Sequence, residues 1–264
     1  MSFVRRLRSF RRRRILIPVD HTSLVLDVGS GDKPHWRADV LLDRYPGREH
    51  GGQRSGAMAV RIDRPLFYAD AADMPFADKV FDYAICSHTL EHVEKPDAVL
   101  AELTRVAKAG YIEVPEASSA KIVDFPSHLW WVTLDDGMLV FTAKSNAYFD
   151  ADIDRYLTTS GMRQKLADLL DHDIDHRVIE LPWTGSITCR VVGSPSAELI
   201  EASRQPDAHH RGLDALAARI MTLAMTLPMR RRKHRGPILY DDIVRPELRS
   251  ARHERLSAKI YHPT

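Results

Sequence analysis

Short apolar segments of strand length recur between residues 24 and 115, and this recurrence constrains the fold more than any other feature of the chain. An apolar stripe with helical spacing runs through residues 97–107. Strands that alternate with helices form a parallel sheet covered on both faces. The sequence therefore predicts a doubly wound α/β fold, with strands at 24–28, 38–43, 65–70, 81–87 and 110–115.

Polar residues stand at the end of each predicted strand. The carboxyl ends of parallel strands meet at one edge of a sheet, where open α/β sheets bind their ligands. We therefore expect a ligand crevice lined by the residues at these ends: Asp27, Gly29, Gly31, Asp43, Asp70, Ser87, His88, Glu113 and Glu116.

The turn after the first strand, GSGDKPH, narrows the choice of ligand. Gly29 and Gly31 let a ligand approach the backbone closely, and the acid Asp43 suits the hydroxyls of a ribose. A dinucleotide site would have a third glycine where Pro34 stands, to bring a helix N-terminus onto a pyrophosphate. The turn therefore favours a nucleoside ligand without phosphate. S-adenosylmethionine is such a ligand, and its positive sulfonium suits an acid-lined crevice.

Three motifs carry a family resemblance: VLDVGSG, ADAADMPF and FDYAICSHTLEHV. Together with the helix and strand that follow, they resemble the class I S-adenosylmethionine-dependent methyltransferases of the small-molecule, type 11-like subgroup, over residues 23–115. The resemblance implies a Rossmann-like, seven-stranded sheet whose last two strands form an antiparallel pair at 176–193. Lys33 replaces the third glycine of the family motif, and the usual Pro-Gly-Gly before the fifth strand is shortened to KAG.

The resemblance also implies roles for the cofactor residues. Asp27, Gly29 and Gly31 would hold the methionyl part and the ribose, and Asp43 would accept the ribose hydroxyls. The adenine edge would lie against Asp70 and Ala71, with Ser87 near the methionine end.

His88 follows the fourth strand, beside the expected position of the methyl group. Transfer of a methyl group to a hydroxyl requires removal of a proton, and a histidine near neutral pH can accept it. Glu91 is a second candidate, as a base or as a group that orients His88. The alternative for His88 is a loop histidine held by hydrogen bonds. The alternative for Glu91 is a solvated residue at the start of a helix. His92 is expected to be structural or to line the substrate pocket.

Residues 116–150 interrupt the alternation and predict an inserted hairpin around Asp136 and Gly137 that caps the crevice. The candidate substrate residues here are Glu116, His128, Trp130 and Trp131, because indole faces stack on sugar rings or lipid-linked substrates. The alternative is that the tryptophans pack onto the body of the protein. A Mg²⁺ site made by Glu113, Glu116 or His88 stays open, with no metal ligand assigned.

Two arginine-rich clusters lie outside the predicted core. The first fourteen residues hold seven arginines, residues 229–237 hold four arginines and one lysine, and the rest of the chain has an acidic excess of about ten. We interpret these clusters first as solvated ends of the chain. Peripheral contact with an anionic membrane is the second interpretation, and nucleic-acid binding is the third.

The expected organisation is a basic segment at 1–20, a methyltransferase domain at 21–194 and a helical, basic extension at 195–264. Cys86 and Cys189 are expected to be reduced, as in a cytoplasmic protein. No apolar run approaches the roughly 18–20 residues that span a bilayer.

These features predict an O-methyltransferase that acts on a hydroxyl of a small molecule, preferably a sugar, an oligosaccharide or a glycolipid of polysaccharide biosynthesis. The alternatives are a nucleic-acid methyltransferase and a cofactor-binding scaffold without turnover. A homodimer is left open.

Overall fold

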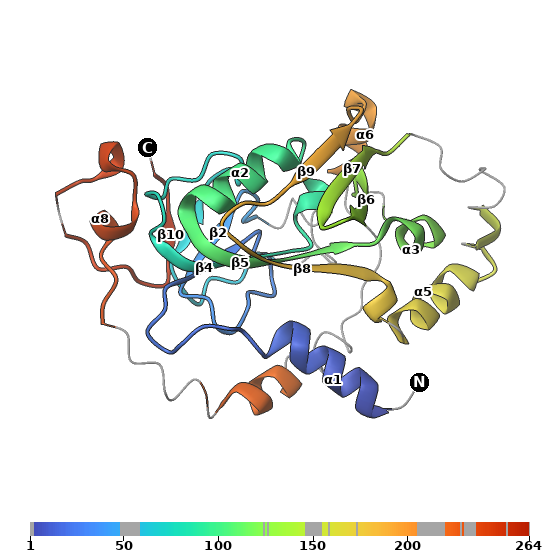
Figure 1. The fold of residues 1–264 in the computed structure, drawn as a ribbon, viewed down its shortest axis with the longest axis horizontal. Helices are drawn as coiled ribbons and strands as arrows, with labels where there is room; N and C mark the ends of the chain where they lie inside the picture. The colour runs from blue at the N-terminus through green and yellow to red at the C-terminus, as the bar shows by residue number, and fades with distance from the viewer. Residues whose placement is uncertain are drawn as a thin grey trace.

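A computed structural model describes residues 3–47, 59–123, 125, 127–145, 155–157, 159–172, 174–204, 220–227, 229, 236–251 and 253–263. Its main element is a seven-stranded sheet with the strand order β10-β3-β2-β1-β4-β5-β8 (Figure 1). The predicted α/β fold with a seven-stranded sheet is confirmed. Residues 48–58, most of the arginine cluster at 229–237 and residues 205–219 of the extension lie outside the described part of the chain.

The five parallel strands lie where the apolar segments predicted them. Neighbouring strands from β3 to β5 all pair in parallel. Their bounds are Val25–Val28 (β1), Val40–Asp43 (β2), Leu66–Tyr68 (β3), Phe81–Ser87 (β4) and Ala107–Pro115 (β5).

Helix α2, Pro96–Val106, packs an apolar stripe against the sheet. Val99, Leu100, Leu103 and Val106 are buried, as the helical spacing predicted. Gly110 in β5 has no room for a side chain, because a Cβ would lie 2.3 Å from the carbonyl oxygen of Ala84. The main core joins one face of the large sheet to the apolar side of the smaller one, and two separate clusters that include Val25 and Leu41 lie on the other face.

The predicted antiparallel strand pair at 176–193 is wrong in its pairing. Its first strand, β8 (Val178–Thr184), does run antiparallel to β5 at the edge of the main sheet. The chain then turns at Gly185, where φ is +76°, and β9 (Cys189–Val192) joins a separate sheet. There β9 runs parallel to β7 (Met138–Ala143), which is antiparallel to β6 (Trp130–Asp135).

The seventh strand of the main sheet comes instead from the C-terminal region. β10, Ile260–Tyr261, pairs in parallel with β3 at the opposite edge. The sequence predicted a helical, basic extension at 195–264, with no strand of the main sheet in it. The aromatic stack of Tyr261 on Phe67, with ring centroids 5.2 Å apart, explains the attachment of β10.

The basic N-terminal segment forms helix α1, Phe3–Arg14, which lies beside β8 (Figure 1). It was expected to be a solvated end. Instead Arg12 pairs with Asp175 and Glu180, and Arg13 pairs with Glu113. Three carboxylates, two from residues 175–180 and one from β5, therefore hold this helix on the body of the protein.

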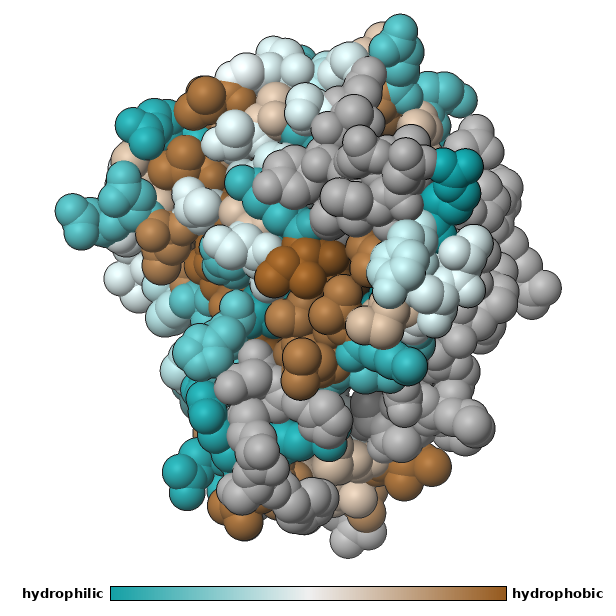
Figure 2. Space-filling model, turned by 90° about the vertical axis from the view of Figure 1, so that its right-hand side faces the viewer, coloured by the Kyte–Doolittle hydropathy of each residue, from teal (hydrophilic) through white to brown (hydrophobic). Residues whose placement is uncertain are grey.

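The remaining helices are short. At the end of the molecule that carries α3 and α5 (Figure 1), Figure 2 shows an apolar patch on the surface. Ile122 of α3 and Leu169 of α5 are 46% and 65% exposed. Their bounds and those of the other short helices are Ala117–Ile122 (α3), Met162–His172 (α5), Ala197–Ser203 (α6), Tyr240–Ile243 (α8) and the 3-10 turns Leu90–His92 (η2), Ile174–His176 (η3) and Pro246–Leu248 (η4).

Candidate functional site

The carboxyl ends of the parallel strands meet in register. Asp43 of β2 is aligned with Tyr68 of β3, and Ser87 of β4 is aligned with Glu113 of β5. β1 lies between β2 and β4 and ends at Val28. The polar residues that follow these strands therefore lie along one edge of the sheet.

The glycine turn after β1 is tightly packed. Gly29 and Gly31 have φ values of +69° and +51°, which glycine adopts without strain. A Cβ on Gly29 would lie 2.2 Å from the hydroxyl oxygen of Thr89, so no side chain fits there. The Thr89 hydroxyl also donates to the carbonyl of Val28 at 3.1 Å. The turns after β1 and β4 are thus locked together.

Two buried acids support this turn. One Asp43 oxygen accepts from the backbone N–H of Gly31 at 2.9 Å, and the other accepts from that of Tyr45 at 2.7 Å. Asp27 accepts from the backbone N–H of His35 at 2.7 Å. Burial raises the pKa of Asp27 to about 6, although the His35 bond lowers it. Asp27 therefore titrates in the weakly acidic range.

Asp70, predicted to hold an adenine edge, already has two partners. Its carboxylate lies 2.6 Å from Arg44 and accepts from the backbone N–H of Ala72 at 2.9 Å. Ala71 is buried and contributes to the core. The sequence contained no signal for the Arg44 contact.

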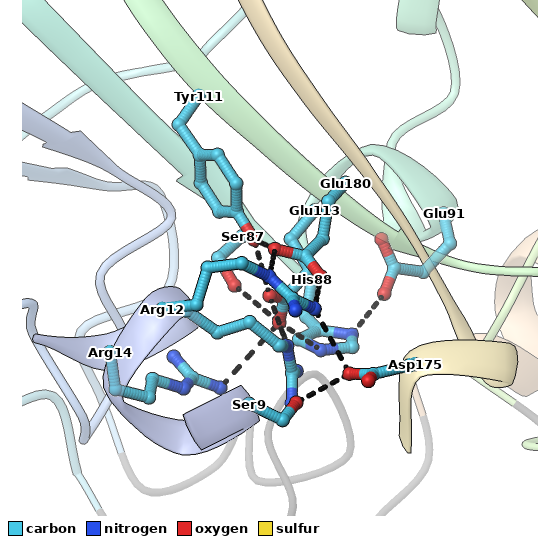
Figure 3. Close-up of polar contacts among 11 residues, drawn as sticks. Ser9, Arg12, Arg14, Ser87, His88, Glu91, Tyr111, Glu113, Asp175 and Glu180 are labelled. Carbon is cyan, nitrogen blue, oxygen red and sulfur yellow. Dashed lines mark hydrogen bonds and ion pairs between the residues drawn. The ribbon is translucent and has the colours of Figure 1, made fainter. Parts of the chain in front are cut away.

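His88 lies between two carboxylates at the end of β4. Its Nδ1 is 3.2 Å from Glu91 and its Nε2 is 3.0 Å from Glu113 (Figure 3). The histidine side chain is 38% exposed, whereas both glutamates are 1% exposed. Its φ of +54° is an uncommon backbone conformation for a histidine, which strained functional positions often show.

The protonation of His88 follows from these contacts. Burial lowers the pKa of His88, but the hydrogen bonds to Glu113 and Glu91 outweigh that effect and raise it to about 9. The ring is therefore a cation at neutral pH, and both of its nitrogens donate.

Glu113 is the centre of this cluster. The sequence predicted only that Glu113 lines the crevice. Besides His88, it accepts two bonds from Arg13, at 2.6 and 2.7 Å, one from Tyr111 at 2.8 Å and one from Ser87 at 3.3 Å. Burial raises the pKa of Glu113, but the hydrogen bond from His88, the charge of Arg14 and the hydrogen bonds from Arg13 hold it well below its usual range. Glu113 is therefore ionised. Local sequence contains no signal that joins Arg13 to a residue a hundred positions away.

The candidate substrate residues of the insert are not on an open surface. Glu116 caps α3 by accepting from the backbone N–H of Ser119 at 3.0 Å. Trp130 and Trp131 are buried, and Trp130 donates from its ring N–H to the carbonyl of Val93 at 2.8 Å. Both indoles are core side chains, which corrects the prediction of exposed faces for stacking.

His92 and His128 lie together behind His88. Their rings meet edge to face with centroids 4.9 Å apart. The Nδ1 of His92 is 2.9 Å from the carbonyl oxygen of Ser127. Burial, together with electrostatic interactions with His92 and Lys144, holds the pKa of His128 well below its usual range. His128 is therefore neutral.

Comparison with known protein families identifies part of the chain. The sequence profile described as a methyltransferase domain matches residues 26–112. These residues form a class I S-adenosylmethionine-dependent methyltransferase domain. The match confirms the resemblance found in the sequence. No curated protein matches the chain.

Solved structures similar to this chain have a sequence identity of about a fifth over the matched part. One is the complex of the Trm112 methyltransferase activator with a methyltransferase from Haloferax volcanii, at 19% identity, covering 44% of this chain and 54% of that one, with a TM-score of 0.33. Another is a possible histamine N-methyltransferase from Thermotoga maritima, at 19% identity, with coverages of 43% and 52% and a TM-score of 0.30. A third, from Pyrococcus horikoshii, has 20% identity, coverages of 51% and 68% and a TM-score of 0.34. The chain spans about half the length of the first two.

The methyltransferase fold implies S-adenosylmethionine as cofactor, and the turn after β1 fits it. Ser30, between the two glycines, has a buried hydroxyl without a hydrogen-bond partner among the described residues. A buried polar group normally has a partner, and a ligand seated at this turn would supply one. The neighbouring acids Asp27 and Asp43 suit hydroxyls and a sulfonium rather than a pyrophosphate. Ser30 and Asp43 would hold the nucleoside.

Across the described residues, no helix combines the length and the apolar character needed to cross a membrane.

Proposed function

We propose that the protein is an S-adenosylmethionine-dependent O-methyltransferase that acts on a hydroxyl of a small molecule, with a sugar or glycolipid as the favoured acceptor. One observation carries the proposal. A partly exposed, backbone-strained His88 follows β4 and is held by Glu91 and Glu113 at the end of the cofactor edge.

The bound cofactor supplies a methyl group on a sulfonium sulfur. In the proposed transfer, the acceptor oxygen forms a bond to this methyl carbon as the carbon–sulfur bond breaks, and the hydroxyl proton leaves to a base. Holding the acceptor in line supplies most of the rate enhancement, and a positioned base contributes further.

His88 can accept this proton only as a neutral imidazole, so Nε2 must first lose its own proton to solvent and give up its contact with a carboxylate. Glu113 is suited to release Nε2, because Arg13, Tyr111 and Ser87 still satisfy its oxygens. Glu91 would keep Nδ1 and orient the ring. An acceptor hydroxyl would then replace Glu113 at Nε2 of this partly exposed side chain.

The contacts of α1 favour a small-molecule acceptor over a nucleic acid. Arg12 and Arg13 pair with carboxylates of the body, so these two cations are not available to phosphates. Nucleic-acid binding rests on such cations.

The test is a turnover screen that measures S-adenosylhomocysteine release over sugars, oligosaccharides and glycolipids, with magnesium and with a chelator. The matched variant is His88→Asn, because asparagine tolerates a positive φ. We expect its turnover to fall by about 10²–10⁴-fold, with affinity for S-adenosylhomocysteine within about twofold of the parent. Wild-type turnover in this variant would remove His88 from the base role. Cofactor binding without turnover on any acceptor would support the scaffold alternative.

A further inference from the structure

Three side chains with metal-ligating groups converge behind His88. Glu91 and His92 come from η2, and His128 comes from the segment before β6. One ligand atom from each lies within 4.8 Å of the others. The backbone N–H of Leu129 also donates to the carbonyl of Glu91 at 2.7 Å, so the two segments are already in direct contact.

The orientation of His92 is that of a metal ligand. Its Nδ1 donates to the carbonyl of Ser127, which leaves the lone pair on Nε2 directed at the cluster, 3.9 Å from Glu91. Histidines that bind metals commonly donate their other ring N–H to a backbone carbonyl in this way.

Two buried atoms of the cluster lack partners. Glu91 Oε2 and His128 Nδ1 have no hydrogen-bond partner among the described residues, and both side chains are more than nine-tenths buried. Glu91 uses its other oxygen for His88. Buried carboxylate oxygens and imidazole nitrogens rarely stay unpaired, so both atoms point to a group that is not part of the chain.

We propose that Glu91, His92 and His128 bind a first-row divalent transition metal of the zinc type. Two imidazoles and one carboxylate form a ligand set typical of zinc, with a further position open, whereas Mg²⁺ prefers oxygen ligands. This inference does not depend on the proposed acceptor.

The positive charges around the cluster limit its affinity for a metal ion. His88, Lys144 and Arg177 lie close enough to act electrostatically on the cluster, and they oppose a dication. The amine of Lys144 donates to the carbonyl of Phe125 at 3.1 Å. The metal would cross-link η2 to the strand that starts the smaller sheet, so its first effect is on stability.

The experiment uses the full chain, treated with a chelator, dialysed and titrated with Zn²⁺ by calorimetry, with Co²⁺ absorption as a spectroscopic probe. We expect one tight equivalent, visible Co²⁺ bands from an imidazole-containing site and a rise in the melting temperature. Mg²⁺ should produce none of these.

The variants are Glu91→Gln, which keeps the shape of the side chain, and His128→Asn. Each should lower the affinity for the tightly bound Zn²⁺ by about 100-fold or more and abolish the zinc-induced rise in melting temperature. The matched control, His21→Ala, removes an exposed histidine and should change neither. If His128→Asn fails to fold, Glu91→Gln alone decides the result. Zinc binding of equal affinity in Glu91→Gln and the parent, or no stoichiometric binding in the parent, would overturn the proposal.

Discussion

Arg13 of α1 and Glu113 of β5 form a two-bond ion pair between segments a hundred residues apart, with side chains only 9% and 1% exposed. Glu113 also holds His88. The N-terminal helix is therefore joined to the cluster around His88 and is not a free basic tail.

The variant Arg13→Ala tests this relationship. Removing one partner of a buried ion pair leaves a buried charge uncompensated, and we expect a loss of about 3–5 kcal/mol in the free energy of unfolding, measured with urea. The control is Arg11→Ala, an exposed position on the same helix, which should change stability by less than about 0.5 kcal/mol. Equal stability of the two variants would show that α1 does not dock on Glu113. Deletion of residues 1–14 should likewise impair the protein even with a soluble acceptor.

Asp27 makes the stability of the protein depend on pH in an unusual direction. The folded pKa of about 6 is above the ordinary value of 3.8, so between these pH values the folded state binds more protons than the unfolded state. The contribution of Asp27 to stability therefore falls as the pH rises from about 4 to 6, by on the order of 3 kcal/mol.

Asp27→Asn, which keeps one acceptor oxygen for His35, should remove this dependence. The stability of the variant relative to the parent should rise between pH 4 and pH 7 and then stay level. Urea unfolding of both proteins at several pH values measures this difference. A difference that is constant over the range would contradict the raised pKa.

Gly29 and Gly137 form a matched pair for the turn after β1. Both have positive φ, but a Cβ on Gly137 meets nothing within 4 Å, whereas one on Gly29 would collide with Thr89. Gly137→Ala should cost about 1–2 kcal/mol from backbone conformation alone. Gly29→Ala should cost clearly more and also weaken the binding of S-adenosylhomocysteine, as measured by calorimetry. Equal costs would mean that the turn can move away from Thr89.

Asp43→Ala tests the assignment of the ribose site. A hydrogen bond to a charged group contributes about 1.5–3 kcal/mol, so we expect affinity for S-adenosylhomocysteine to fall by about 10–100-fold. Asp63→Ala, which removes a partly exposed acid that pairs with Arg61, serves as control and should keep the parent affinity. Unchanged affinity in Asp43→Ala would place the ribose elsewhere.

The parallel core could be predicted because its signals are local. Apolar runs such as 81–87 and the stripe through α2 depend on residues a few positions apart, and the structure places β4 and α2 there. The partners of β9 and β10 depend on contacts between distant segments, which a periodic pattern does not contain. The same strand that was expected beside β8 therefore pairs with β7.

In the candidate site, too, the features that depend on local sequence could be predicted and those that depend on long-range contacts could not. The acids and glycines at the strand ends could be placed from the order of the strands alone. Whether Trp130 is exposed, or whether Arg13 reaches Glu113, depends on how an insert and a terminal helix pack. The cluster of Glu91, His92 and His128 joins two neighbours in sequence to a residue more than thirty positions away. The motif LEHV therefore contains only the first two of its members.

Strand β10 has a consequence for how the protein is made. The outer edge of β3 is covered by Ile260 and Tyr261, which emerge from the ribosome some 190 residues after their partner. Until they arrive, β3 has an unpaired edge, and exposed strand edges favour association between nascent chains. The main sheet can therefore close at β3 only after residues 260 and 261 have been synthesised, and a product truncated before them would keep an unpaired strand edge.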